Sequence, residues 1–120
     1  MEIRKDILMK DIEIRELFRS REEYAGKEIV VRGWVRGNRA SNQFGFISLN
    51  DGTFFTPLQV VYEASKIDNY EEISKVHLAA GVMVKGVLEL TPGAQQPFEL
   101  KATEITVEAD SLSDYPLQKK

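Results

Sequence analysis

The chain has 120 residues, of which 42% are hydrophobic and 29% are charged, and its formal net charge is −3. A chain of this size buries roughly 60–70% of its extended surface, so the sequence predicts one globular domain with a hydrophobic core. The absence of cysteine excludes disulfides, a thiol nucleophile and thiolate zinc sites. No apolar run approaches the roughly 20 residues of a membrane span, and the first residues lack the apolar core of a secretory signal, so we expect a cytoplasmic protein without a membrane partner.

An amphipathic helix is predicted near the N-terminus, at 11–19. The apolar residues there follow the i, i+3, i+4 spacing of one helical face: Ile14, Leu17 and Phe18. Asp11 is the predicted N-cap of this helix, and Gly26 ends the helical pattern. We assign residues 1–27 to an N-terminal extension and helix.

Five strands are predicted after this helix, from runs rich in β-branched and aromatic residues: 28–36, 44–50, 58–62, 82–90 and 98–107. The first two runs flank a polar segment of Gly, Asn, Arg and Ser, which is typical of a β-hairpin with a longer loop. A second helix is predicted between the third and fourth strands, at 69–78, with four residues on one face: Tyr70, Ile73, Val76 and His77.

This order of elements is typical of an OB-fold, a five-stranded barrel with a helix between strands three and four. We therefore expect an all-β fold with added helices, with the barrel at 28–108 and a hinge toward a further domain at 109–120. Gly33 and Gly86 fall in mid-strand, where a small barrel needs bends or close backbone approaches. An open five-stranded sheet packed on two helices would give the same order of elements and is the alternative.

Basic side chains are concentrated around the first hairpin. Residues 27–49 carry four basic side chains against one acid, a local charge of +3, which leaves −6 for the rest of a chain whose total is −3. The four are Lys27, Arg32, Arg36 and Arg39. A small basic site on an acidic body favours selective local binding over general affinity for nucleic acid.

Phe46 is the predicted stacking residue of this hairpin. Ile47 and Leu49 lie on the opposite face of the strand, so if they fill the core, the Phe46 ring points to solvent. OB-folds bind single strands on the face of strands two and three. An exposed ring beside arginines such as Arg36 and Arg39 suits unstacked bases and their phosphates.

No catalytic or metal site is predicted. The chain lacks a Gly-rich phosphate loop, and its single histidine, His77, has no second histidine or serine–acid arrangement to act with. The expected activity of this chain is therefore binding.

Several short motifs follow one another along the chain: Gly33-Trp34-Val35, Arg39, Phe46-Ile47, Asn50-Asp51-Gly52 and Gln59. Three longer segments accompany them, at 51–59, 91–100 and 115–120. Over about residues 12–120, this set resembles the N-terminal anticodon-binding domain of bacterial asparaginyl-tRNA synthetase, a class II enzyme of the aspartyl, asparaginyl and lysyl subgroup. The last segment resembles the hinge that leads into the catalytic domain of that family.

The resemblance implies that the matching residues read a tRNA anticodon. Phe46 would stack on the central anticodon uracil, Gln59 would hydrogen-bond the edge of that uracil, and Arg39 would hold the same base or its phosphate. Glu99, in the strand after the Pro-Gly loop, would help to read another anticodon base. Arg36, on the same hairpin as Phe46, is the fifth expected RNA-binding residue.

The same resemblance implies a parent enzyme, an ATP-dependent asparagine–tRNA ligase that is a homodimer and whose partner is the anticodon loop of tRNA-Asn. ATP and magnesium would bind a catalytic domain that begins after residue 120, so no cofactor is expected in this chain. The chain is then expected to be a fragment or a separately produced piece that binds tRNA and catalyses nothing. One departure from the subgroup is that Gly37 and Asn38 stand where arginine is frequent.

Three alternatives remain open at this point. The first is a free-standing OB-fold protein that binds single-stranded nucleic acid. The second is the same domain of an aspartyl- or lysyl-tRNA synthetase. The third is a structural or protein-interaction domain in which the hairpin is core and the arginines are merely surface.

Overall fold

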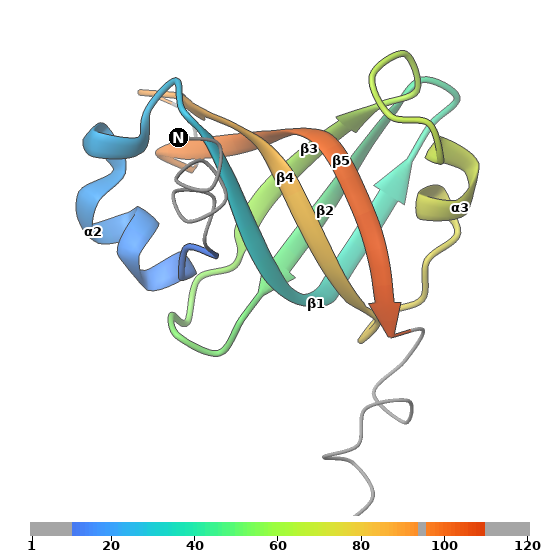
Figure 1. Cartoon of the computed structure of the whole chain (residues 1–120), viewed down its shortest axis with the longest axis horizontal. Coiled ribbons are helices and arrows are strands. Elements are labelled where there is room, and N and C mark those ends of the chain that lie inside the picture. The colour runs from blue at the N-terminus through green and yellow to red at the C-terminus, as the bar shows by residue number, and fades with distance from the viewer. Residues whose placement is uncertain (1–10, 94–95, 110–120) are drawn as a thin grey trace, which may run out of the picture.

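The computed structural model describes residues 11–93 and 96–109, which form a closed barrel with a helix at each end (Figure 1). In chain order the elements are α2 (Ile14–Tyr24), β1 (Glu28–Ala40), β2 (Phe44–Asn50), β3 (Leu58–Glu63), α3 (Tyr70–Ser74), β4 (Gly81–Leu90) and β5 (Phe98–Ala109). The strands close in the order β1-β2-β3-β5-β4. The predicted five-stranded OB-fold barrel, with a helix between the third and fourth strands, is confirmed, and the open-sheet alternative is wrong.

β1 closes the barrel because its two halves pair with different neighbours. The first half runs antiparallel to β4 and the second half runs antiparallel to β2, while β3 and β5 form a parallel seam on the far side. Two mid-strand glycines permit close backbone approaches. A Cβ on Gly33 would collide with the backbone of Asn50, and a Cβ on Gly86 would collide with the backbone of Lys101. The close approaches expected at these glycines are confirmed.

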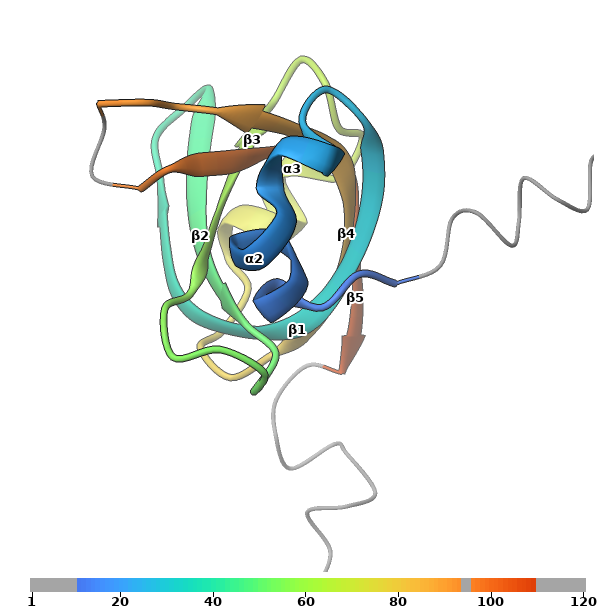
Figure 2. The same ribbon diagram turned by 90° about the vertical axis from the view of Figure 1, so that its left-hand side faces the viewer.

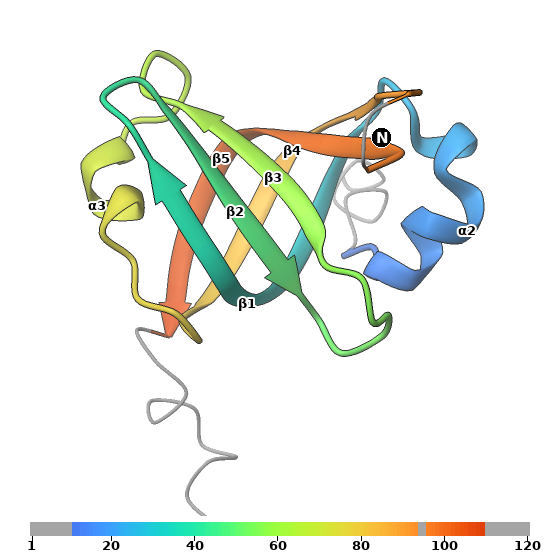
Figure 3. The same cartoon turned by 180° about the vertical axis from the view of Figure 1, so that it is seen from behind.

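Alternate residues of each strand fill the barrel, as the pleat of a strand requires. On β2 and β3 the fully buried side chains are Ile47, Leu49, Leu58, Val60 and Tyr62. Figures 1 and 3 show α2 and α3 at opposite ends of the barrel, and Figure 2 shows α2 lying across one mouth. At that mouth Ile14 and Leu17 are buried, and the Phe18 ring packs on Phe98 with the ring centroids 4.8 Å apart.

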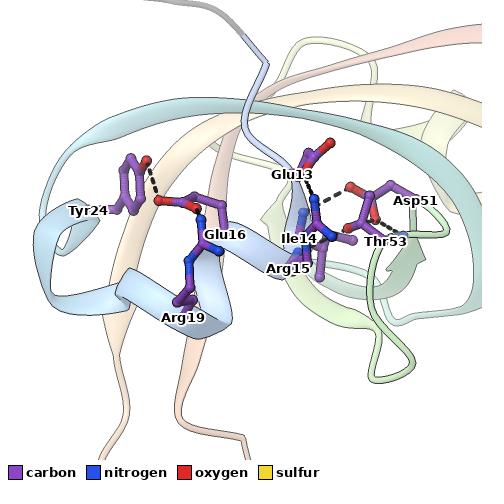
Figure 4. Close-up of polar contacts among 8 residues, drawn as sticks. All are labelled: Glu13, Ile14, Arg15, Glu16, Arg19, Tyr24, Asp51 and Thr53. Atoms are coloured by element: carbon purple, nitrogen blue, oxygen red, sulfur yellow. Dashed lines mark hydrogen bonds and ion pairs between the residues drawn. The ribbon is translucent and has the colours of Figure 1, made fainter.

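The loop between β2 and β3 caps α2 (Figure 4). The Asp51 carboxylate accepts a hydrogen bond from the Ile14 N–H at 2.8 Å, and the Thr53 hydroxyl accepts one from the Arg15 N–H at 3.0 Å. These bonds satisfy backbone donors that a helix leaves free at its first turn. The predicted N-cap at Asp11 is wrong: the helix begins at Ile14, and its cap comes from a loop 37 residues further along the chain.

The second helix is shorter than predicted. It covers Tyr70–Ser74 rather than 69–78, and Ile73 is its buried residue. The N–H of Lys75 bonds to the carbonyl of Glu72, a tighter turn that ends the α-helical pattern. His77 lies beyond the end of this helix and is exposed rather than packed on a helical face, and Ala79 further on has a positive φ of 73°.

Parts of three predicted segments lie outside the described residues. They are the first ten residues of the N-terminal extension, residues 94–95 of the Pro-Gly loop, and the hinge beyond Ala109. Within residues 11–93 and 96–109, no helix is long and apolar enough to cross a membrane.

Candidate nucleic-acid interface

Two phenylalanine rings stand on the outer face of β2. Phe44 and Phe46 are 46% and 40% exposed, while the residues that alternate with them point into the barrel. Gly45 faces inward against the Tyr62 ring, and Ile47 is fully buried. The predicted outward orientation of Phe46 is confirmed. The surface holds a second ring, Phe44, that the sequence argument did not assign to the site.

Arg39 lies directly across from Phe46 in the β1–β2 register. It is exposed on a strand, not in a loop as predicted, because β1 continues to Ala40 and its pairing with β2 carries the polar residues 37–40 into the sheet. Arg36 is also exposed, and it occupies a bulge where the register shifts between Val35 and Gly37. Among the described residues, neither arginine takes part in an ion pair.

Arg32 does not belong to this cluster, although it lies on the same strand. Its guanidinium binds the carboxylates of Asp11 and Glu108, near the C-terminal end of β5. The hydrogen bonds to Asp11 and then Glu108 raise the pKa of Arg32. The local positive charge predicted for 27–49 is thus partly neutralised. Within the part of the chain described, Arg39 is the unpaired cation opposite Phe46, and Arg36 is an unpaired cation further back along β1, at the bulge.

Gln59 and Glu99 meet across the parallel seam. The Gln59 amide Nε2 donates a hydrogen bond to the Glu99 carboxylate at 3.2 Å. A carboxylate only accepts, so its partner must be the amide NH₂ group, and this contact fixes which way the amide points. On the other side, Lys101 lies 3.8 Å from Glu99 and 2.9 Å from Glu89, and the hydrogen bond to Glu89 raises the pKa of Lys101.

The register places this polar pair beside the aromatic ring. Phe46 pairs with Val61, and Gln59 lies two residues from Val61 on the same outer face, which makes it a diagonal neighbour of Phe46. The structure therefore brings Arg39, Phe46, Gln59 and Glu99 onto one outer surface, with Arg36 near its edge. The contact between Gln59 and Glu99 is a feature that sequence reasoning missed, because the two residues are 40 positions apart.

The end of the β1–β2 hairpin is held in place by bonds to the body of the protein. The Tyr62 hydroxyl donates to Asn38 Oδ1 at 2.7 Å, and Asn38 Nδ2 donates to the Ile73 carbonyl at 2.9 Å. The Tyr70 hydroxyl donates to the Ser41 carbonyl at 2.7 Å. Asn38 thus binds inside the barrel end. Burial raises the pKa of Tyr62 to about 12.

Comparisons with known proteins agree with this geometry. The sequence profile of the OB-fold nucleic acid binding domain matches residues 29–108. The asparagine–tRNA ligase of Alkaliphilus oremlandii is 54% identical over 112 residues, which are 93% of this chain and 24% of that protein. The corresponding ligase of Acetivibrio thermocellus is 53% identical over the same shares of the two chains. The chain thus spans about a quarter of the length of these curated relatives.

A solved structure shares the fold. The asparaginyl-tRNA synthetase of Pyrococcus horikoshii, determined with asparaginyl-adenylate, superposes with a TM-score of 0.73 at 21% identity, over 90% of this chain and 24% of that one. The predicted resemblance to the asparaginyl-tRNA synthetase domain is confirmed by these relatives. The profile match covers most of the chain and the chain folds as a closed five-stranded barrel, so the chain belongs to the family of OB-fold nucleic acid binding domains.

Proposed function

We propose that this chain recognises the anticodon of tRNA-Asn as part of an asparagine–tRNA ligase. The observation that carries the proposal is the exposed Phe46 ring, with the Arg39 guanidinium, which forms no ion pair among the described residues, on one side and the Gln59–Glu99 pair on the other. A flat ring beside a cation suits an unstacked base and its phosphate. The relatives named asparagine–tRNA ligase have 53–54% sequence identity to this chain over 93% of its length, and they support RNA rather than DNA as the ligand.

Each residue of the surface has a distinct role in this proposal. Phe46 stacks on the central anticodon uracil, and Arg39 holds the phosphate or the same base. Arg36, at the edge of the surface, adds positive charge for the neighbouring backbone. Gln59 reads the uracil edge with one acceptor and one donor, and Glu99 orients that amide and faces the adjacent anticodon base.

The remaining activity belongs to the proposed parent enzyme. Such an enzyme attaches asparagine to tRNA with ATP and magnesium, which would bind outside this chain. A homodimer in the cytoplasm is the expected form of that parent. This chain supplies the RNA-binding surface and none of the reacting groups.

Titration with anticodon stem-loops tests the proposal on the full 120-residue chain. The probe is a stem-loop with a seven-nucleotide loop and the anticodon GUU, compared with the same loop carrying GCU and with GUC, the aspartate anticodon. We expect GUU to bind most tightly, and single-stranded DNA of the same loop sequence not to compete. Tighter binding of GUC would favour an aspartyl specificity, and equal binding of GUU and GUC would favour a mixed specificity. Effective competition by DNA would favour a general single-strand binder.

Two matched variants locate the RNA surface. Base–aromatic stacking contributes about 1–3 kcal/mol, so Phe46→Ala should weaken binding of the GUU loop about 5- to 150-fold. Phe55→Ala is the control, because Phe55 is 86% exposed in the loop at the other end of β2. Loss of affinity in both variants, or in neither, would contradict the placement of the anticodon on Phe46.

A further inference from the structure

Phe44 is a second exposed ring on the outer face of β2 that the roles above leave unused. It is 46% exposed, slightly more than Phe46, and the two side chains share a face because they are two residues apart on a strand. Phe44 faces solvent because Gly45, the next residue of the strand, faces the barrel interior, where the Tyr62 ring fills the space. A pair of adjacent aromatic rings in solvent is a continuous apolar surface rather than one scattered residue.

The backbone that carries Phe44 is held on both sides. The Phe44 N–H donates to the Ser41 hydroxyl at 3.4 Å, and the Ser41 N–H donates to the Phe44 carbonyl at 2.8 Å. Ser41 is in turn bonded to Tyr70 at 2.7 Å, and the Gln43 carbonyl accepts from the Ala64 N–H at 2.9 Å. A ring on a backbone fixed in this way loses little freedom when a ligand stacks on it.

A shallow hollow of about 280 Å³ lies beside the two rings, lined by Arg39, Ala40, Ser41, Phe44 and Phe46. The two sides of the rings differ in charge. Arg39 borders the hollow on the β1 side, and Glu63 pairs with Phe44 on the β3 side. A polyanion is attracted to the first side and repelled from the second, which favours a path with the phosphates along Arg39 and the bases over the rings.

We propose that Phe44 is a second stacking platform, which holds the nucleotide next to the base on Phe46. The interface then takes two consecutive bases of single-stranded RNA. Two residues along a strand rise about 6.6 Å, whereas neighbouring stacked bases are about 3.4 Å apart. The two bases must therefore unstack from each other to occupy both rings, which suits a loop and disfavours a duplex. The inference rests on the proposed function, because it uses the same strand of RNA.

The test combines protein variants with abasic RNA. The full chain, Phe44→Ala, Phe44→Leu and Phe44→Tyr are titrated with the GUU stem-loop and with three loops, each abasic at one anticodon position. We expect Phe44→Ala and Phe44→Leu to lose about 5- to 150-fold in affinity, and Phe44→Tyr to bind like the parent chain. On the loop that is abasic at one of the two positions flanking the central base, Phe44→Ala should bind no more weakly than the parent chain. On the loop that is abasic at the central position, Phe44→Ala should still bind more weakly than the parent chain.

The outcomes separate this inference from the proposed function. Wild-type affinity of Phe44→Ala, together with weak binding of Phe46→Ala, would overturn the second platform and leave anticodon binding intact. Wild-type affinity of both variants would overturn both. Retention of affinity by Phe44→Leu would show that the position offers only apolar contact. A loss that is the same on all three abasic loops would show that Phe44 acts through the shape of the hairpin rather than on a base. Thermal unfolding of each variant checks that the exposed site has been changed without loss of the fold.

Discussion

Glu99 fixes the orientation of the Gln59 amide, and we expect Glu99→Gln to weaken discrimination between uracil and cytosine at the central anticodon position. A free glutamine amide can present its donor and acceptor in either order, and so can pair with either pyrimidine. In this structure the NH₂ group is committed to Glu99 at 3.2 Å. The order of donor and acceptor that the amide would present to RNA in the proposed function is therefore set by the carboxylate.

The size of the effect follows from what a cytosine would require. To match cytosine, the amide must turn over, lose its hydrogen bond to a charged acceptor and place its carbonyl oxygen against a carboxylate. A hydrogen bond to a charged group contributes about 1.5–3 kcal/mol, which corresponds to a preference for uracil of about 10- to 150-fold. In Glu99→Gln the new side chain can accept from the amide or donate to it, so both orientations become equally good and the preference should fall toward unity.

The assay is titration of stem-loops that differ only in uracil or cytosine at the central position. Glu89→Gln is the matched control, because Glu89 contacts Lys101 and not Gln59. It removes the same charge and should keep the preference. Gln59→Ala should bind both loops more weakly, with the preference reduced. Full discrimination by Glu99→Gln would refute the argument that the carboxylate orients the amide.

Three further predictions concern stability. Asp51→Ala removes the acceptor for the Ile14 N–H, and loss of such a cap should cost about 0.5–2 kcal/mol, measured as a lower midpoint in thermal or urea unfolding; an unchanged midpoint would mean that water replaces the cap. Gly45→Ala should destabilise strongly, since its Cβ would collide with the Tyr62 ring, whereas Gly37→Ala meets only Ser48 at 3.7 Å and should be tolerated; similar melting temperatures for the two variants would contradict this packing. Burial raises the pKa of Tyr62 from 10.0 to about 12, so the neutral hydroxyl should stabilise the fold fully below pH 10, and this stabilisation should be lost as the pH rises through about 12. Tyr62→Phe should remove this loss of stability at alkaline pH; if the loss persists in the variant, it belongs to another group.

The succession of strands along the chain and the face of Phe46 could be predicted from sequence because both depend on local pattern. β-branched runs separated by turn residues predicted the five strands, and the alternation of Phe46 with Ile47 and Leu49 predicted which side meets solvent. Gly33 and Gly86 marked two points where backbones approach each other. These features need no knowledge of which strand lies beside which.

The features that were missed depend on contacts between distant parts of the chain. Asp11 has the side chain of an N-cap, but it binds Arg32, and the cap of α2 comes from Asp51. The composition of residues 37–40 is that of a loop, yet pairing with β2 makes them a strand. Only the closed barrel shows that Gln59 meets Glu99. Local pattern carries no information about such partners.

In the proposed function, the parallel seam between β3 and β5 bears on how accurately the central anticodon base is recognised. It consists of two register pairs, Val60 with Leu100 and Val61 with Lys101, whereas the antiparallel β4–β5 hairpin pairs along almost its whole length. Phe46 and Arg39 belong to the continuous meander β1–β2–β3 and keep their places if this seam loosens. Gln59 and Glu99 lie on opposite sides of it. In the proposed function, affinity for RNA therefore depends on the β1–β2–β3 meander, whereas discrimination between bases depends on the β3–β5 seam, which has the fewest paired residues of the strand pairs described.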